Sequence, residues 1–309
     1  MKSFRELPVV LAAASLCLVT TSVWALTPFE KLGKKLYFDE DLSEPNGQSC
    51  ASCHLPSAGF ADPDQGIPVS EGVIPGLFGE RNSPTAAYVM YNPIFHFNGE
   101  LYVGGQFLDG RATGNELGDP LADQALAPFL NPVEMANTSK TTVVRDALES
   151  NYKKKFISQC GDVDLSSDAE VDTAYNCIAS AIGQFERTKR FAQFSSKYDK
   201  YLSTCIDMDD ASDTALNQCA IGQGENAATA GEEVLSGDEW VGLQLFMGGN
   251  NNDGVYDKGE GAACAACHVA NWSNVNDYSL NVQDAPWAPE GMVPPVFSDF
   301  TNKYIDYTT

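Results

Sequence analysis

Two cysteine pairs, each followed directly by a histidine, are the clearest candidates for a functional site in this sequence. They are Cys50, Cys53 and His54 in CASCH, and Cys264, Cys267 and His268 in CAACH. In such a motif the cysteine sulfurs add to a porphyrin as thioethers, and the histidine ligates its iron. Two of the chain's three histidines lie in these motifs. The sequence therefore predicts two haem c groups, with His54 and His268 as ligands to the iron.

Zinc binding and thiol redox chemistry are the alternatives for such cysteine pairs. A four-cysteine zinc site usually has its pairs within some tens of residues, whereas these pairs lie in opposite halves of the chain, and it does not need the histidines. A thioredoxin-like pair needs a βαβ setting that the sequence does not contain. Haem attachment uses every residue of both motifs, so we favour it.

Helices are the elements that must position both motifs. Residues 26–38 offer Thr27 as a cap and Pro28 at the first helical position, and their apolar residues recur on one face. Residues 166–188 and 236–249 also show helical spacing of apolar side chains after serine caps. No segment alternates long enough to predict a substantial strand. The predicted fold class is mainly α.

The two halves of the chain share an order of features. GKKLYF from Gly33 and GLQLFM from Gly242 each end a predicted helix and precede a loop that leads to a cysteine motif. This pattern is typical of two copies of one unit. We therefore predict a signal peptide over residues 1–25 and two related domains, one haem in each, over residues 26–150 and 151–309. The boundary is placed in the charged stretch ALESNYKKKF.

The N-terminus predicts export. Lys2 and Arg5 precede an apolar run, and small residues end at Ala25, which is typical of a cleaved secretory signal. An uncleaved anchor is the alternative, although the run is short for a membrane span. The predicted location is the periplasm, without stable membrane insertion. The net charge of −23 argues against nucleic acid as a partner and favours simple solubility or a basic partner.

Four further cysteines follow in the predicted exported chain: Cys160, Cys177, Cys205 and Cys219. An even number in such a chain predicts two disulfides. Four cysteines allow three connectivities. Local closure favours Cys160 with Cys177 and Cys205 with Cys219, and the sequence leaves the other two connectivities open.

Function depends on the second axial position of each iron. A strong sixth ligand makes an electron carrier, whereas an open position admits a small molecule. His96 is the remaining histidine, and we interpret it as a hydrogen-bonded structural residue rather than a ligand. We interpret the methionines at positions 90, 135, 208, 247 and 292 as core packing. At least one haem then keeps an open, catalytic position.

A series of motifs in this order is recognisable: LGKKLYFDEDLSEPNGQSCASCHLPSAGFAD, VSEGV, GERNSPT, GGQFLDGRATG, LADQALAPFLNPVEM and AIGQFERTKRFAQFSSKYDKYL, then the second CAACH. The series resembles the bacterial di-haem cytochrome c peroxidase and MauG family, from about residue 30 to the end. The resemblance implies two mainly helical cytochrome c domains, with the active site on the N-terminal haem and electron entry at the C-terminal haem. Family members are often dimers.

The resemblance also implies site residues. It assigns Gln124 and Glu134 to the distal pocket, with Glu134 as the acid–base residue. A carboxyl group there can move a proton between the two oxygens of hydrogen peroxide, and an amide can orient the peroxide by hydrogen bonding. Asn82 matches the family's ligand to a calcium ion, for which an amide oxygen is suitable.

Departures from the family pattern carry their own expectations. Residues 55–95 contain no histidine, so we expect the N-terminal haem to react without prior reduction, as in MauG-like members. Leu108 stands where the family usually has a tryptophan between the haems, which argues against rapid transfer between them. The chain stops at Thr309, before the family's distal ligand to the second haem, and we expect the reading frame to be truncated. Asp109 and Arg111 are interpreted as a structural ion pair.

Three functions follow from these observations. The first is an exported peroxidase that reduces hydrogen peroxide to water, with a small c-type cytochrome or copper protein as the electron donor. The second is a MauG-like enzyme that oxidises a partner protein or an organic substrate. The third is a non-catalytic di-haem electron carrier. The absence of a loop histidine favours the second function, and Leu108 disfavours it.

Overall fold

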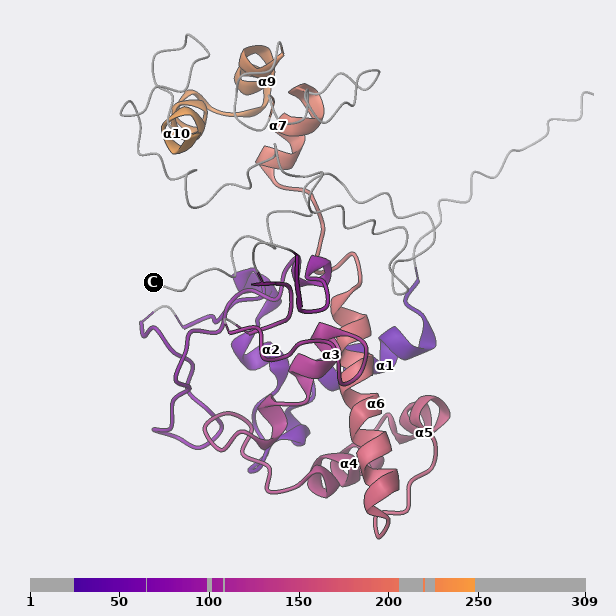
Figure 1. Cartoon of the computed structure of the whole chain (residues 1–309). Coiled ribbons are helices and arrows are strands. Elements are labelled where there is room, and N and C mark those ends of the chain that lie inside the picture. Colours follow the sequence, from indigo (N-terminus) through magenta and orange to yellow (C-terminus); the bar gives the residue numbers. More distant parts are fainter. Residues whose placement is uncertain are drawn as a thin grey trace, which may run out of the picture.

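The computed structural model describes residues 25–64, 66–98, 102–107, 109–205, 219 and 226–247. The predicted signal peptide up to residue 24, Leu108, the second cysteine motif and the C-terminal end lie outside these residues. In the described part, helices predominate, as predicted (Figure 1). The only strands there are two short antiparallel ones, β1 (His96–Phe97) and β2 (Tyr102–Val103).

The helices are separated by connections of very different length. The helices are α1 (Pro28–Tyr37), α2 (Cys50–Cys53), α3 (Pro120–Ala125), α4 (Lys140–Glu149), α5 (Lys153–Cys160), α6 (Asp168–Glu186), α7 (Lys197–Cys205), α9 (Ala227–Val234) and α10 (Gly237–Met247). The longest described connection lies between α2 and α3. Short 3-10 helices are η1 (Glu40–Leu42), η2 (Pro56–Ala58), η3 (Val89–Tyr91) and η4 (Pro128–Leu130). The helices predicted from residues 26–38, 166–188 and 236–249 are confirmed as α1, α6 and α10.

Helix α1 begins where its sequence predicts. The Thr27 hydroxyl accepts a hydrogen bond from the Glu30 amide, and the Glu30 carboxylate accepts one from the Thr27 amide. This reciprocal arrangement is a capping box, and Pro28 occupies the first helical position. The apolar face buries Leu32, Leu36 and Tyr37. Helix α1 thus presents one apolar face to the core.

Helices α1 and α6 pack closely, and Gly33 makes this possible. A β-carbon at Gly33 would lie 1.8 Å from the carbonyl oxygen of Ala181 and 2.9 Å from the β-carbon of Phe185. Only a residue without a side chain fits at that distance. Ser167 caps the N-terminus of α6, where its hydroxyl accepts a hydrogen bond from the Glu170 amide.

An aromatic cluster forms the centre of this core. The ring of Tyr37 meets those of Phe185 and Phe191 edge to face, with centroids 5.5 Å apart in both pairs, and Phe60 stacks on Phe191. Such geometry adds to the burial of apolar area. The same core takes in Phe156 of α5 and the apolar face of α6. The boundary predicted near residue 150 is therefore not an edge of this core, which continues to Phe191 because α5 and α6 pack with α1.

A buried ion pair joins α3 to the end of α6. The guanidinium of Arg187 donates from Nε to Asp119 Oδ2 at 2.9 Å, and Nη2 pairs with the other carboxylate oxygen. Arg187 Nη1 also donates to the Met90 carbonyl at 2.8 Å. Asp119 in turn caps α3 by accepting from the Leu121 amide. These bonds satisfy both buried charges and hold α3 in place.

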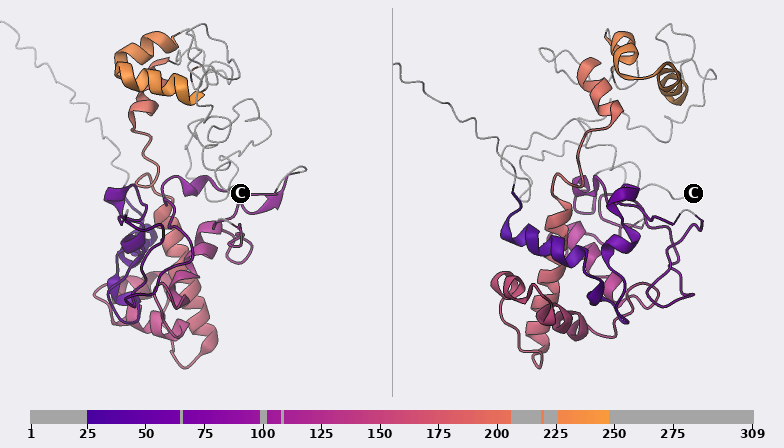
Figure 2. Two further views of the ribbon diagram at one scale, coloured as in Figure 1. Left: turned by 90° about the vertical axis from the view of Figure 1, so that its left-hand side faces the viewer. Right: turned by 180° about the vertical axis from the view of Figure 1, so that it is seen from behind.

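Helices α7, α9 and α10 form a second cluster with its own small core (Figure 2). Its fully buried residues are Tyr201, Leu202, Cys205, Cys219, Ala227 and Ala230. On the surface, the Lys197 ammonium pairs with the Glu239 carboxylate at 2.8 Å and links α7 to α10. We refer to α1–α6 as the first part and to α7, α9 and α10 as the second cluster.

Two disulfides are present, Cys160–Cys177 and Cys205–Cys219. These are the two pairings that local closure favours. The first joins the end of α5 to α6, and the second lies in the core of the second cluster. Among the described helices, none combines the length and apolarity that crossing a lipid bilayer requires.

Candidate active site

The first cysteine motif forms one helical turn, α2, and the chain then turns at His54. The His54 amide donates to the Cys50 carbonyl at 2.9 Å and ends the helix. Cys50 and Cys53 form no disulfide, and both are half-buried. The helical turn therefore places two reduced thiols beside the following histidine, as haem attachment requires.

The His54 ring is oriented by backbone carbonyls. Its Nδ1 lies 3.2 Å from the Phe60 carbonyl oxygen, and the Pro84 carbonyl also interacts with the ring. A carbonyl can only accept, so a proton on Nδ1 satisfies the Phe60 carbonyl and leaves the Nε2 lone pair for a metal. Burial lowers the pKa of the imidazole, which favours the neutral form that binds metal. These residues fit a haem c group in both attachment and axial ligation.

Tyr37 connects α1 to this motif. Its hydroxyl donates to the His54 carbonyl at 3.0 Å, while its ring belongs to the aromatic cluster. The turn after α2 is therefore fastened to the core of the first part. A haem attached here would rest on a histidine whose backbone and ring are both held.

Glu134 lies in the turn after η4, and a local hydrogen bond orients its carboxylate. Asn131 Nδ2 donates to Glu134 Oε1 at 2.7 Å, while Asn131 Oδ1 accepts from the Val133 amide at 3.1 Å. Burial raises the pKa of the Glu134 carboxyl, and the Asn131 hydrogen bond and the Arg111 charge offset part of that rise. The result is a half-buried acid with a tendency to hold its proton.

The VSEGV segment packs directly on this turn. The Val73 amide donates to the Glu134 carbonyl at 2.8 Å. A β-carbon at Gly72 would lie 2.2 Å from the Val133 carbonyl oxygen, so only glycine permits this approach. The segment thereby fixes the backbone of Glu134 from outside.

The Glu134 carboxylate acts electrostatically on the cysteine motif. Burial is the main cause that raises the pKa of the Cys50 and Cys53 thiols, and the charge of Glu134 adds to the rise at both. Glu134 is thus within electrostatic reach of both thiols, and its place above a haem on this motif stays a prediction.

Comparison with known proteins decides the family. A model of the di-haem cytochrome c peroxidase family matches residues 28–205. The chain belongs to the di-haem cytochrome c peroxidase family. The matched region of this family member contains the whole arrangement of Cys50, His54 and Glu134.

Both peroxidases and MauG proteins are among the relatives of this family member. It is 38% identical over 179 residues to the methylamine utilization protein MauG of Paracoccus denitrificans, and 29% identical over 248 residues to the cytochrome c551 peroxidase of Nitrosomonas europaea. The aligned regions cover 55% and 79% of this chain, but only 43% and 53% of the relatives. The chain therefore spans about half the length of the curated relatives it matches.

A solved structure gives the same indication. The diheme peroxidase BthA from Burkholderia thailandensis matches with a TM-score of 0.58 and 29% sequence identity. The match covers 81% of this chain and 51% of that one. The mainly helical fold of this family member is thus shared with a diheme peroxidase.

Gln124 lies on α3 and is half-buried. The helix is held by the Asp119–Arg187 pair, and the carboxylate of Asp123 accepts from the amides of Gly114 and Leu117 at 2.7 and 2.8 Å. Gln124 is therefore on a well-fixed element. No hydrogen bond joins its side chain to Glu134, and its place in the distal pocket stays a prediction.

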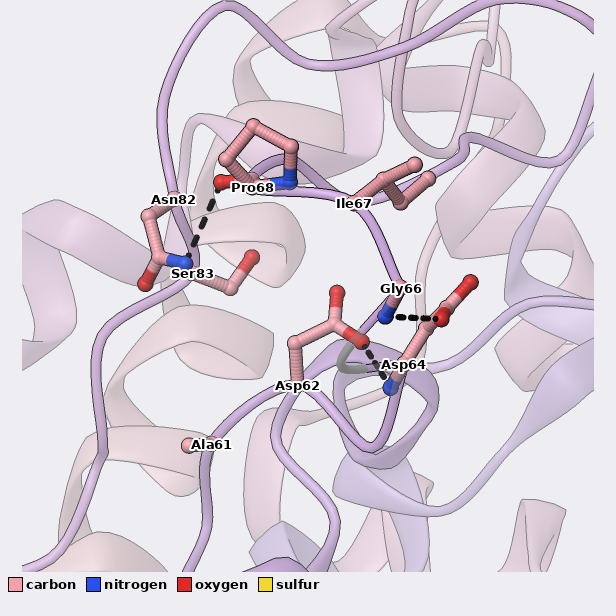
Figure 3. A pocket seen from close by; sticks show the side chains of 8 residues that line it. All are labelled: Ala61, Asp62, Asp64, Gly66, Ile67, Pro68, Asn82 and Ser83. Atoms are coloured by element: carbon pink, nitrogen blue, oxygen red, sulfur yellow. Dashed lines mark hydrogen bonds between the residues drawn. The ribbon is translucent and has the colours of Figure 1, made fainter.

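Asn82 lines an open pocket of about 440 Å³, which Figure 3 shows. Its Nδ2 donates to the Pro68 carbonyl at 3.2 Å, and the carboxylates of Asp62 and Asp64 accept from nearby amides (Figure 3). In the described ranges, no group of three histidines, cysteines or acids could hold a metal ion. Calcium binding by Asn82 therefore stays a prediction.

Three other sequence interpretations are confirmed where the residues are described. His96 lies exposed on β1, and its Nδ1 is 2.7 Å from the Ile94 carbonyl oxygen. Met90 and Met135 are buried in hydrophobic clusters. Asp109 pairs with Arg111 at 2.8 Å and also with Arg81 at 3.0 Å.

Several supporting residues were missed by reasoning from sequence. Phe60 and Pro84 act through their carbonyls, which leave no trace in residue type. Tyr37 looks like an ordinary core residue of a helix. Asn131 carries a usable signal, because an Asn-Pro dipeptide is typical of a turn, and its side chain commonly bonds the backbone two residues on.

Proposed function

We propose that this chain reduces hydrogen peroxide to water at a haem carried by Cys50, Cys53 and His54, with electrons from a small redox protein. The observation that supports this most directly is Glu134, whose carboxyl pKa is raised by burial and whose charge reaches both cysteine thiols. Bound haem would supply the redox chemistry of its iron. The overall reaction consumes one peroxide, two electrons and two protons and releases two waters.

The role of Glu134 in this proposal is to move a proton. A peroxide must lose a proton from one oxygen and gain one at the other before the bond between them breaks to give water. In its ionised form, the half-buried Glu134 carboxylate held by Asn131 can accept that proton and return it without reorienting. Gln124, on the fixed helix α3, would orient the peroxide through its amide.

The remaining parts of the proposal concern residues outside the described ranges or properties of the whole protein. A second haem on Cys264, Cys267 and His268 would receive electrons from a small c-type cytochrome or copper protein. The two haem domains would meet after Phe191, where the core of the first part ends. The chain would act in the periplasm after cleavage of the signal peptide near Ala25. Asn82 would ligate a calcium ion, and two copies of the chain would form a homodimer.

A MauG-like activity is the second candidate, in which a partner protein or organic substrate is oxidised. The observation that favours it is the 38% identity to MauG of Paracoccus denitrificans. The absence of histidine from residues 55–95 points the same way.

Peroxide reduction by the fully ferric, as-isolated protein, supplied with a reduced c-type cytochrome, tests the proposal. We expect turnover without prior reduction and a loss of about 10²-fold to 10⁴-fold in kcat for Glu134→Gln, because a general acid–base contributes that much. Glu149→Gln, an exposed acid at the end of α4, is the matched control and should keep the wild-type rate.

Two outcomes would contradict peroxidase activity. Equal rates in Glu134→Gln and the wild type would remove Glu134 from the reaction. Haem bleaching by peroxide without consumption of the reduced cytochrome would favour the MauG-like candidate instead.

A further inference from the structure

Glu186 is a buried acid to which the proposed reaction assigns no role. It is the last residue of α6, its exposed fraction is 6%, and its Oε2 has no hydrogen-bond partner. Buried polar atoms are nearly always hydrogen-bonded, and an ionised carboxylate without a partner is strongly disfavoured. The burial of Glu186 without a partner for Oε2 therefore suggests a functional role.

The charged groups around Glu186 do not neutralise it. Arg187, its neighbour in the chain, directs its guanidinium to Asp119 of α3 and to the Met90 carbonyl. Asp119 acts on Glu186 as a like charge. Burial and Asp119 together raise the pKa of Glu186 to about 8, while Arg187 lowers it. Glu186 is thus mostly protonated at neutral pH and close to the range where it titrates.

Glu186 also lies within electrostatic reach of the haem attachment site. Its charge contributes to raising the pKa of the Cys50 thiol and of Tyr37, after burial in each case, and Arg190 opposes it at Tyr37. The Cys50 sulfur would carry the porphyrin edge, and Tyr37 donates to the His54 carbonyl. A charge on Glu186 is therefore felt at the Cys50 sulfur and at the Tyr37 hydroxyl, which donates to the His54 carbonyl.

We propose that Glu186 is a redox-linked proton site for the haem on Cys50 and His54: it binds a solvent proton when that haem gains an electron, and it releases the proton when the electron leaves. This rests on the haem attachment in the proposed function. Ferric haem carries one more positive charge than ferrous haem, so the ferric state favours the carboxylate and the ferrous state favours the carboxyl. The coupling is reciprocal, so protonation of Glu186 also favours reduction.

Spectroelectrochemical titration of the haem-loaded full chain, at pH values on both sides of 8, tests this. We expect the midpoint potential of one haem to fall as pH rises in the wild type. In Glu186→Gln that potential should no longer depend on pH in this range. Glu186→Asp keeps a titratable group and should keep a slope, and Glu149→Gln should behave as the wild type. The potential of the second haem should be the same in all variants.

Redox-difference infrared spectra give an independent measurement. A carbonyl band of a protonated carboxyl should accompany reduction in the wild type and be absent from Glu186→Gln. Equal pH slopes and unchanged bands in haem-loaded wild type and Glu186→Gln would overturn the inference alone. Peptide mass spectrometry that finds no haem on Cys50 and Cys53 would overturn the proposed function together with it.

Discussion

Helices α1 and α10 share a sequence pattern but differ in packing. Both end in a short motif that begins with glycine, at Gly33 and at Gly242. Helix α1 buries Leu32, Leu36 and Tyr37, whereas Val241 and Leu245 of α10 keep 49% and 37% of their surface exposed. Gly33 touches the backbone of α6, and no described atom lies within 4 Å of a β-carbon at Gly242.

The shared pattern therefore specifies a helix in both places, whereas close packing also requires a partner element. In the first part, α6 supplies that partner and the resulting core holds Tyr37 against His54. In the second cluster, the described core has six buried residues, two of which are the disulfide-bonded Cys205 and Cys219. The first part is therefore expected to depend on packing and the second cluster on its cross-link.

Loss of the buried ion pair should cause the largest loss of stability, and this loss should occur in the first part. Arg187→Met leaves Asp119 charged and buried, which should lower the free energy of unfolding by about 3–5 kcal/mol. Urea denaturation followed by far-ultraviolet circular dichroism would measure this. Arg190→Met, at an exposed arginine of the same segment, should change it little. Equal stability of the two variants would contradict the role of the pair.

Removal of the Cys205–Cys219 disulfide should destabilise the second cluster and leave the first part unchanged. The bridge closes a loop with a sequence separation of 14, for which the loss of a cross-link costs about 3 kcal/mol. We expect Cys205→Ser with Cys219→Ser to increase hydrogen exchange in α7 and α9 and to leave α1 and α6 protected. Increased exchange in α1 would show that the two parts unfold together.

Alanine at the two glycines should change stability in opposite directions. Gly33→Ala places a β-carbon 1.8 Å from the Ala181 carbonyl oxygen, and such overpacking costs about 1–3 kcal/mol. Gly242→Ala meets no described atom and should stabilise α10 by up to about 1 kcal/mol, because alanine is the better helix former. Thermal unfolding of both variants measures the difference. A destabilising Gly242→Ala would mean that α10 is as closely packed as α1.

Titration of Glu186 should change stability gradually with pH, and only in the first part. Its folded pKa, about 8, lies above the ordinary value of 4.5, so its contribution to stability is complete below pH 4.5 and is lost as pH rises through 8. Relative to Glu186→Gln, the wild type should lose up to about 1.4 kcal/mol per pH unit in this window. Urea denaturation at several pH values measures the slope. Parallel profiles would show that Glu186 titrates normally.

Much of the fold could be predicted because its signals are local. Thr27 and Pro28 begin α1 by satisfying backbone groups within one turn, and the nearest cysteines form the two disulfides. The extent of the first core could not be predicted. Charged residues near position 150 suggested a boundary, but they occupy the exposed sides of α4 and α5, whose apolar sides join the same core.

The candidate site divides in the same manner. Cys50, Cys53 and His54 are predicted from residue type and spacing, since attachment chemistry needs them within one helical turn. The carbonyls of Phe60 and Pro84 that orient His54 cannot be read from any side chain. The burial of Glu186 depends on the meeting of α1, α3 and α6, and its position after an apolar run suggested only a helix end.

The family resemblance, the helices and the haem attachment motif follow from the sequence alone, because they depend on residues close together in the chain. Which acids are desolvated follows only from the folded chain, because desolvation depends on elements that meet from distant positions. Glu134 is enclosed by the VSEGV segment, and Glu186 by the junction of α6 with α1 and α3. Burial then raises the pKa of both carboxyls, and residue type alone could not have distinguished these two glutamates from the exposed ones.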